Sequence, residues 1–179
     1  MWKNTADRYG LVARILHWGI ALLLVAVFAL GWWTTEMSYY DPLYRIVPNL
    51  HRSLGLLTLV LVLARIAWVL TQPRPALAPT LAPWERYAAK TVHLLLYLLM
   101  VLVPVSGYLM STADGRAVEV FGLLQVPALL APDGARGELA GKAHYYLAFG
   151  GAYLVLLHVA AALKHHFIDR DGTLRKMIG

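Results

Sequence analysis

The chain has 179 residues, of which 59% are hydrophobic and 15% charged, and it contains no cysteine. The mean hydropathy of +0.57 lies above the usual range of soluble globular domains. The absence of cysteine excludes disulfides, thiolate metal sites and cysteine-ligated iron–sulfur clusters. The formal net charge of +6 comes from basic residues that flank long apolar runs, which indicates a membrane protein and no nucleic-acid partner.

Four apolar runs are long enough to cross a bilayer. They cover about residues 15–33, 53–71, 91–111 and 144–163. The first run follows basic residues, as a secretory signal does, but it lacks a small-x-small cleavage site, so we expect it to be retained. The connection over 112–142 has an apolar centre at 120–130, which we expect to lie along the membrane interface. We therefore predict an all-α membrane protein in which residues 1–179 form a single domain with four transmembrane helices.

The distribution of Lys and Arg predicts the orientation of this bundle. On the side of the N-terminus, the linker after the second run and the C-terminal tail, the basic residues are Lys3, Arg8, Arg14, Arg74, Arg86, Lys90, Lys164, Arg170, Arg175 and Lys176. On the other side they are Arg45, Arg52, Arg116, Arg136 and Lys142, and Arg65 lies inside the second run. Cytoplasmic segments carry the excess of positive charge, so we expect both termini in the cytoplasm.

The fourth run carries a histidine near each end. His144 and His158 are fourteen residues apart, so they leave the same face of a helix. That spacing is roughly 21 Å along the axis, most of the thickness of a bilayer's hydrocarbon core. Gly151 lies halfway between them, on the same face. The pattern indicates one cofactor in each leaflet.

The other histidines lie near the ends of the remaining runs. The predicted topology places His51 beside His144 in the outer leaflet. In the inner leaflet it places both His17 and His93 beside His158, which is one histidine more than a pair. His165 and His166 come later, in what we interpret as a solvated basic tail.

Facing pairs of imidazoles are the axial ligands of b-type haem, which needs no covalent attachment. Two such pairs predict two b-type haems without an open position on iron, which favours electron transfer over oxygen activation. A metal transporter also uses histidines within the membrane, but it normally adds carboxylates, and here every Asp and Glu lies outside the runs or at their edges. The residues alone leave open whether His93 or His17 pairs with His158.

Other residues on the interior faces fit this arrangement. Gly31 and Gly107 each lie fourteen residues after a histidine, where a helix would pass the haem of the opposite leaflet. Arg65 lies fourteen residues after His51, on the interior face at the depth of the inner haem. Its guanidinium can bind a haem propionate, or it can extend to the inner membrane surface.

The sequence resembles the bacterial cytochrome b-561 family along its whole length. The resemblance rests on RYGLVARILHW, NLHRSLG, HLLLYLLMVLVPVSGYLM, KAHYYLAF and LHVAAALKHHF. It implies an inner-membrane dihaem protein in which the fourth helix supplies one ligand to each haem. Carried over to this chain, it implies His17 and His158 for the inner haem, and His51 and His144 for the outer one. His93 is then left close to the inner haem.

Some members of the family act as superoxide:quinone oxidoreductases. The resemblance therefore implies a superoxide oxidase that takes electrons from superoxide outside and delivers them to ubiquinone, or another quinone, near the inner haem. The alternative is an electron-transfer subunit docked to a partner, because the bundle also resembles the cytochrome b subunits of formate dehydrogenases and nickel–iron hydrogenases.

Three residues are candidates for the two reaction sites. Arg52 and Lys142 lie within two residues of the outer haem ligands, where positive charge attracts an anion such as superoxide. Either of them can instead pair with a haem propionate. His93 can form a hydrogen bond to a quinone carbonyl or deliver a proton, or it can be a packing residue at the helix end.

Overall fold

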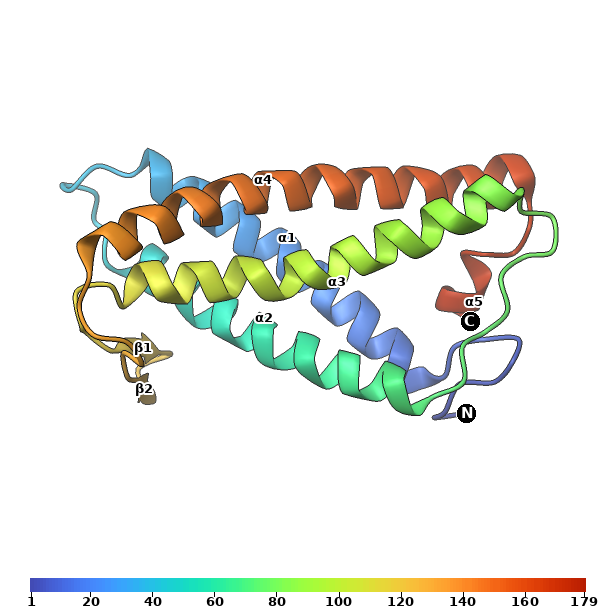
Figure 1. Ribbon diagram of the computed structural model, residues 1–179, viewed down its shortest axis with the longest axis horizontal. Coiled ribbons are helices and arrows are strands. Elements are labelled where there is room, and N and C mark those ends of the chain that lie inside the picture. Colours follow the sequence, from blue (N-terminus) through green and yellow to red (C-terminus); the bar gives the residue numbers. More distant parts are fainter.

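The structure, a computed structural model, describes residues 1–179 and is dominated by four long helices (Figure 1). They are α1 (Leu11–Glu36), α2 (Ile46–Thr71), α3 (Pro83–Ser111) and α4 (Gly134–Lys164). All four are long and apolar enough to cross a membrane. Each expected span falls within one of these helices. The helices extend beyond the apolar runs because backbone hydrogen bonding continues into the polar flanks.

The helices run antiparallel in chain order. α1 packs on α2, α2 on α3, and α3 on α4. Both chain termini lie at one end of the bundle, on the right of Figure 1, and a small β-hairpin lies at the opposite end. We call these the terminal end and the hairpin end. Because each helix reverses the direction of the chain, the start of α2 and the start of α4 meet at the hairpin end.

The long connection between α3 and α4 contains the hairpin. Its strands β1 (Val118–Val120) and β2 (Leu124–Val126) pair antiparallel, with Glu119 opposite Gln125. The turn has a positive φ of 52° at Phe121, a conformation that costs a non-glycine residue energy. The Phe121 N–H donates a hydrogen bond of 3.0 Å to the Ser53 hydroxyl, which ties the turn to α2. The sequence predicts that the apolar centre of this connection, at 120–130, lies along the membrane interface. It does not predict the pairing of the two strands.

Three segments close the terminal end: the N-terminal loop, the linker before α3 and the C-terminal tail. The tail contains a single π-helical turn, η1 (His165–Asp169), and a short helix, α5 (Arg175–Ile178). Hydrogen bonds join the segments, from Ala76 N–H to the Ala6 carbonyl, from Tyr9 N–H to the Lys176 carbonyl, and from the Trp18 indole N–H to the Met177 carbonyl. This end is therefore covered by folded chain.

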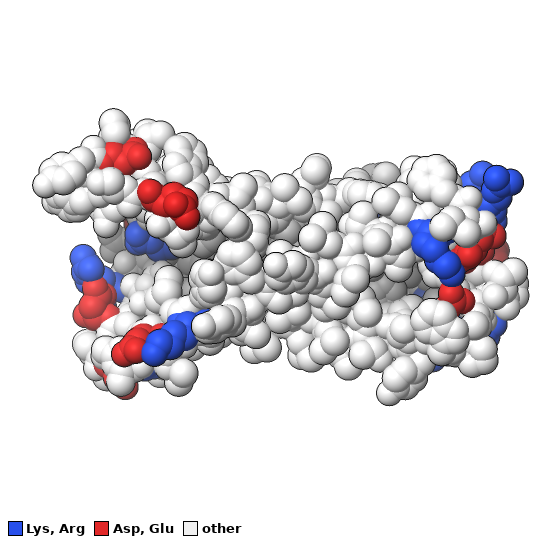
Figure 2. Space-filling model, turned by 90° about the horizontal axis from the view of Figure 1, so that it is seen from above, with Lys and Arg blue, Asp and Glu red and all other residues white.

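The outer surface of the bundle is apolar along its middle. Side chains such as Leu22 and Val60 are 72% and 62% exposed, which suits contact with lipid. Figure 2 shows the same division, with charged side chains gathered at the two ends and none over the middle of that face. Along the middle of the bundle, a site for a polar ligand is therefore to be sought between the helices.

Candidate functional site

Two histidines face each other at the hairpin end. His51 comes from the second turn of α2 and His144 from the part of α4 nearest the hairpin. Their ring centres are 6.0 Å apart and the ring planes are nearly perpendicular, at 84°. The structure thus brings together the two residues that the sequence places in one leaflet.

Backbone carbonyls orient both of these rings. His51 Nδ1 lies 3.0 Å from the Val27 oxygen in α1, and His144 Nδ1 lies 2.9 Å from the Val103 oxygen in α3. A carbonyl can only accept, so each Nδ1 carries the proton and donates it. Each Nε2 then keeps its lone pair free, which is the arrangement found in metal-bound histidines.

Each ring also lies against a glycine. A Cβ at Gly31 would stand 2.8 Å from His51 Cε1, and a Cβ at Gly107 would stand 2.9 Å from His144 Cε1. Each glycine lies four residues after the carbonyl that accepts the hydrogen bond from the same ring. Both glycines were expected on the interior face. The structure adds that each glycine lies directly against an imidazole. A residue with a side chain at either position would clash with that ring.

Three histidines meet at the terminal end. The His158 ring centre is 6.4 Å from that of His17 in α1 and 5.4 Å from that of His93 in α3. None of the three rings takes part in a side-chain hydrogen bond, so each has a free nitrogen. The structure therefore offers two possible pairs that share His158, as the residues alone had done.

The spacing of these rings suits a metal held between two imidazoles. Metal–imidazole bonds of about 2 Å on opposite sides of an ion place the two nitrogens about 4 Å apart, with the ring centres somewhat further. The separations of 6.0 Å for His51 with His144 and 6.4 Å for His17 with His158 fit this requirement. The 5.4 Å between His93 and His158 is tighter. The donor set of neutral imidazoles suits haem iron.

Arg65 adds a positive charge at the terminal end. Its Nε donates a hydrogen bond of 3.1 Å to the Tyr97 hydroxyl, and the guanidinium carbon lies 5.9 Å from the centre of the Tyr97 ring. Its Nη1 is buried without a hydrogen-bond partner. The guanidinium is therefore held against α3, and a buried N–H group remains available for an anion such as a carboxylate. Sequence reasoning missed Tyr97, although it lies one helical turn after His93.

The basic residues at the hairpin end differ in whether a carboxylate pairs with them. Lys142 Nζ lies 2.6 Å from the Glu138 carboxylate, four residues earlier on α4, and Arg116 pairs with Asp114. Arg52 is exposed and has no such partner. The pairing of Glu138 with Lys142 has the i, i+4 spacing of a helix and was readable in the sequence. It weakens the case for Lys142 as a free charge.

The sequence suggests that the C-terminal tail is solvated, whereas in the structure its side chains lie beside carboxylates. His165 Nδ1 lies 2.7 Å from the Asp169 carboxylate and 3.1 Å from that of Asp171. Lys164 bridges Asp169 and Glu85, at 2.8 and 2.7 Å. His165 is thus part of an ion-pair cluster that joins the tail to the start of α3. Lys164 pairs with two of these carboxylates, and the cluster ties the tail to α3.

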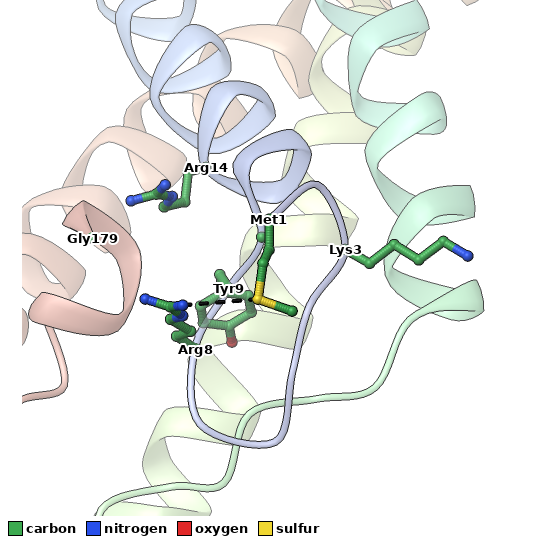
Figure 3. Close-up of a pocket in the computed structure, with 7 residues that line it drawn as sticks. Met1, Lys3, Arg8, Tyr9, Arg14 and Gly179 are labelled. Atoms are coloured by element: carbon green, nitrogen blue, oxygen red, sulfur yellow. Dashed lines mark hydrogen bonds between the residues drawn. The ribbon is translucent and has the colours of Figure 1, made fainter.

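A separate cavity of about 150 Å³ lies beneath α1 at the terminal end (Figure 3). Its lining residues are Met1, Lys3, Arg8, Tyr9, Gly10, Arg14 and Gly179. The two arginines lie on the side of Gly179, whereas Lys3 points away. Arg14 Nη1 donates to the Ile178 carbonyl at 2.7 Å, and burial raises the pKa of Tyr9. None of the histidines lines this cavity, so it is not the candidate site.

Comparisons with known proteins agree along the whole chain. The family model for prokaryotic cytochrome b561 matches residues 8–179. Cytochrome b561 homolog 2 of Escherichia coli K12 is 44% identical over 178 residues, with 99% of this chain and 95% of that protein covered. Cytochrome b561 homolog 1 of the same organism is 28% identical over 177 residues, with 96% and 97% covered. A Yersinia pestis protein named "Probable superoxide oxidase CybB" is 30% identical over 179 residues, with 96% of each covered.

Proposed function

Because the chain belongs to the prokaryotic cytochrome b561 family of haem-b membrane electron carriers, we propose that it is a superoxide oxidase of the bacterial inner membrane. In this proposal, electrons from superoxide outside the membrane reach a quinone near the cytoplasmic side through two b-type haems. The observation that carries the proposal is the pair of histidine clusters at opposite ends of one bundle. When bound, each haem supplies a one-electron redox centre.

His51 and His144 are the proposed ligands of the outer haem. The 6.0 Å separation of the rings and the two carbonyl hydrogen bonds support this assignment. Both bonds hold the proton on Nδ1 and leave the lone pair of Nε2 free for a metal. Gly31 and Gly107 contribute by leaving room for the rings.

His17 and His158 are the proposed ligands of the inner haem. Their 6.4 Å separation suits a metal between them, and the family resemblance implies the same pair. Arg65 is proposed to bind a propionate of this haem through its buried, unpartnered Nη1. The competing assignment pairs His93 with His158. The haem content of the His93→Ala protein distinguishes the two assignments.

His93 is proposed to serve the quinone. Reduction of a quinone to the quinol consumes two electrons and two protons, so the site needs a group that can exchange protons. An imidazole at the same end as the inner haem ligands can donate a hydrogen bond to a quinone carbonyl and relay a proton. The ring of His93 is free of hydrogen bonds to the protein, which leaves it available for this role.

The outer face is proposed to receive superoxide. The name of the Yersinia relative suggests this substrate, at 30% identity. Two imidazoles for each haem would leave no coordination position for superoxide, so this chain's own residues would have to attract the anion to the hairpin end. Arg52, exposed and without a carboxylate partner, is the group best suited to attract it. Lys142 makes a smaller contribution, since Glu138 compensates its charge.

The orientation follows from the excess of basic residues at the terminal end, which we place in the cytoplasm. The proposal is tested by mixing the purified, oxidised protein with superoxide in a stopped-flow spectrometer, without any other protein. We expect rapid appearance of the reduced haem spectrum, and reoxidation on addition of ubiquinone. No haem reduction by superoxide under these conditions would contradict the proposal and favour a subunit that receives electrons from a docked partner.

A further inference from the structure

Arg65 is the single charged side chain within the four apolar runs. No Asp, Glu or Lys, and no other Arg, occurs in residues 15–33, 53–71, 91–111 or 144–163. Arg65 makes no salt bridge, and its Nη1 is buried without a partner. A charge at this depth is costly, so a side chain that keeps one there without a counter-ion is a candidate for a functional role.

The position of this charge is asymmetric along the bundle. The guanidinium contacts Tyr97, one helical turn after His93 on α3, and the His93 ring lies with those of His17 and His158 at the terminal end. It lies fourteen residues from His51 along α2, which is roughly 21 Å. Coulomb energy falls with distance, so the charge acts more strongly at the terminal end than at the hairpin end.

We propose that Arg65, held in place by Tyr97, raises the reduction potential of the inner haem relative to the outer one and so draws the electron toward the terminal end. The inference rests on the proposed dihaem function. A fixed positive charge stabilises an added electron. A propionate bound through Nη1 would offset part of this charge, but no carboxylate of the protein lies in the runs to cancel the rest. At the hairpin end Arg52 is exposed to a high dielectric. Arg136 also has buried, unpartnered guanidinium nitrogens, but it lies outside the apolar runs, eight residues before His144 and so roughly 12 Å away along α4.

Tyr97 is the positioning residue in this arrangement. Arginine side chains near helix ends normally extend toward the membrane surface, where the guanidinium is hydrated. The hydrogen bond of 3.1 Å from Arg65 Nε to the Tyr97 hydroxyl, with the ring at 5.9 Å, holds the guanidinium inside the bundle instead. Loss of the hydroxyl lets the charge move away from the inner haem while keeping it in the protein.

The test is an equilibrium redox titration of the haem absorbance in the purified wild-type and variant proteins. Arg65→Gln should lower the potential of one haem only. We expect the equilibrium constant for the electron between the two haems to fall at least tenfold, which corresponds to about 59 mV for one electron. Arg65→Lys, which keeps the charge, should shift it less. Arg52→Gln, which removes an exposed charge at the other end, should leave the terminal-end haem unchanged.

Tyr97→Phe should shift the same haem in the same direction by a smaller amount, with haem content unchanged. Tyr153→Phe is the matched control, because Tyr153 is an exposed tyrosine on α4, and it should not shift either haem. Repeating Arg65→Gln in a His51→Ala protein, which should keep only the inner haem, identifies the haem that responds.

The outcomes separate the inference from the proposed function. A wild-type protein without two haems contradicts the dihaem function itself. Two haems whose potentials are the same in the wild type, Arg65→Gln and Tyr97→Phe overturn the role of Arg65 and leave the dihaem function standing. If Arg65→Gln fails to retain the inner haem, the potential of the Tyr97→Phe protein decides, since an unchanged value there also overturns the inference.

Discussion

The imidazole of His51 occupies the space where Gly31 would carry a side chain. The position of a Cβ on Gly31 is 2.8 Å from His51 Cε1, and the ring cannot retreat without lengthening its 3.0 Å hydrogen bond to the Val27 carbonyl. α1 thus contributes to the hairpin-end site through a missing side chain and a carbonyl, one helical turn apart. α3 repeats the arrangement for His144 with Gly107 and Val103.

Replacing Gly31 by Ala should therefore disturb the outer haem. The added methyl group forces the His51 ring off its carbonyl partner, so we expect weaker binding of the outer haem and a normal inner haem. Haem content per protein, measured from the pyridine haemochrome, should fall. Gly19→Ala is the control on the same helix, because a Cβ there meets nothing within 4 Å. It should keep full haem content and stabilise the helix by about 1 kcal/mol. Full haem content in the Gly31→Ala protein would show that the ring does not depend on this glycine.

His51→Ala and His144→Ala should each remove one haem. Either change leaves the outer haem with a single protein ligand, whereas the terminal-end histidines are untouched. We expect the haem content to fall from two to one per chain and the remaining haem to stay low-spin, as judged by its optical spectrum. His166→Ala, a histidine of the tail outside both clusters, should keep both haems. Loss of both haems in a His51→Ala protein that is still folded would contradict two independent sites.

His93 and His158 should behave differently at the terminal end. If His158 pairs with His17, His158→Ala removes the inner haem, while His93→Ala keeps both haems and slows electron transfer to quinone. The measurements are haem content and the rate of haem reoxidation by ubiquinone. A His93→Ala protein that loses a haem would assign His93 as a ligand instead. One that keeps both haems and reacts with quinone at the wild-type rate would exclude His93 from the quinone site.

Reduction of the haems by superoxide should depend on ionic strength. The Debye length shortens from about 10 Å at 0.1 M salt to about 3 Å at 1 M, which screens the attraction of an anion to the hairpin end. We expect the second-order rate constant to fall on the order of tenfold over this range. Arg52→Gln should lower the rate at low salt and flatten its salt dependence. Lys142→Gln should have a smaller effect, because Glu138 pairs with Lys142 in the wild type. A reaction that is insensitive to both salt and Arg52 would argue against steering.

Ser53 should matter for stability at the hairpin end. Its hydroxyl is buried, donates to the Asn49 carbonyl at 2.8 Å and accepts from the Phe121 N–H at 3.0 Å. Ser53→Ala leaves that N–H without its partner in a turn that already has an unfavourable φ. We expect a loss of about 1–3 kcal/mol in the free energy of unfolding. Ser111→Ala, which removes a hydroxyl without a side-chain hydrogen bond, is the control and should have little effect.

The sequence by itself determined the number of long helices and the placement of histidines near their ends. Both are properties of a single helix, because length of an apolar run and a spacing of fourteen residues can be counted along the chain. The family resemblance was also readable from the sequence, and the match over residues 8–179 confirmed it. The ion pair of Lys142 with Glu138 was readable too, from its spacing of four residues, but it was overlooked.

Only the tertiary structure decided which groups meet between helices. The carbonyls of Val27 and Val103 have no sequence signature, since every residue carries one. The contact of Arg65 with Tyr97 joins α2 to α3, and the hairpin turn at Phe121 depends on a hydroxyl in α2. Such contacts are set by the rotation and axial register of one helix against another. Hydrophobic periodicity specifies the face that a helix buries, but it leaves that register free until the helices pack.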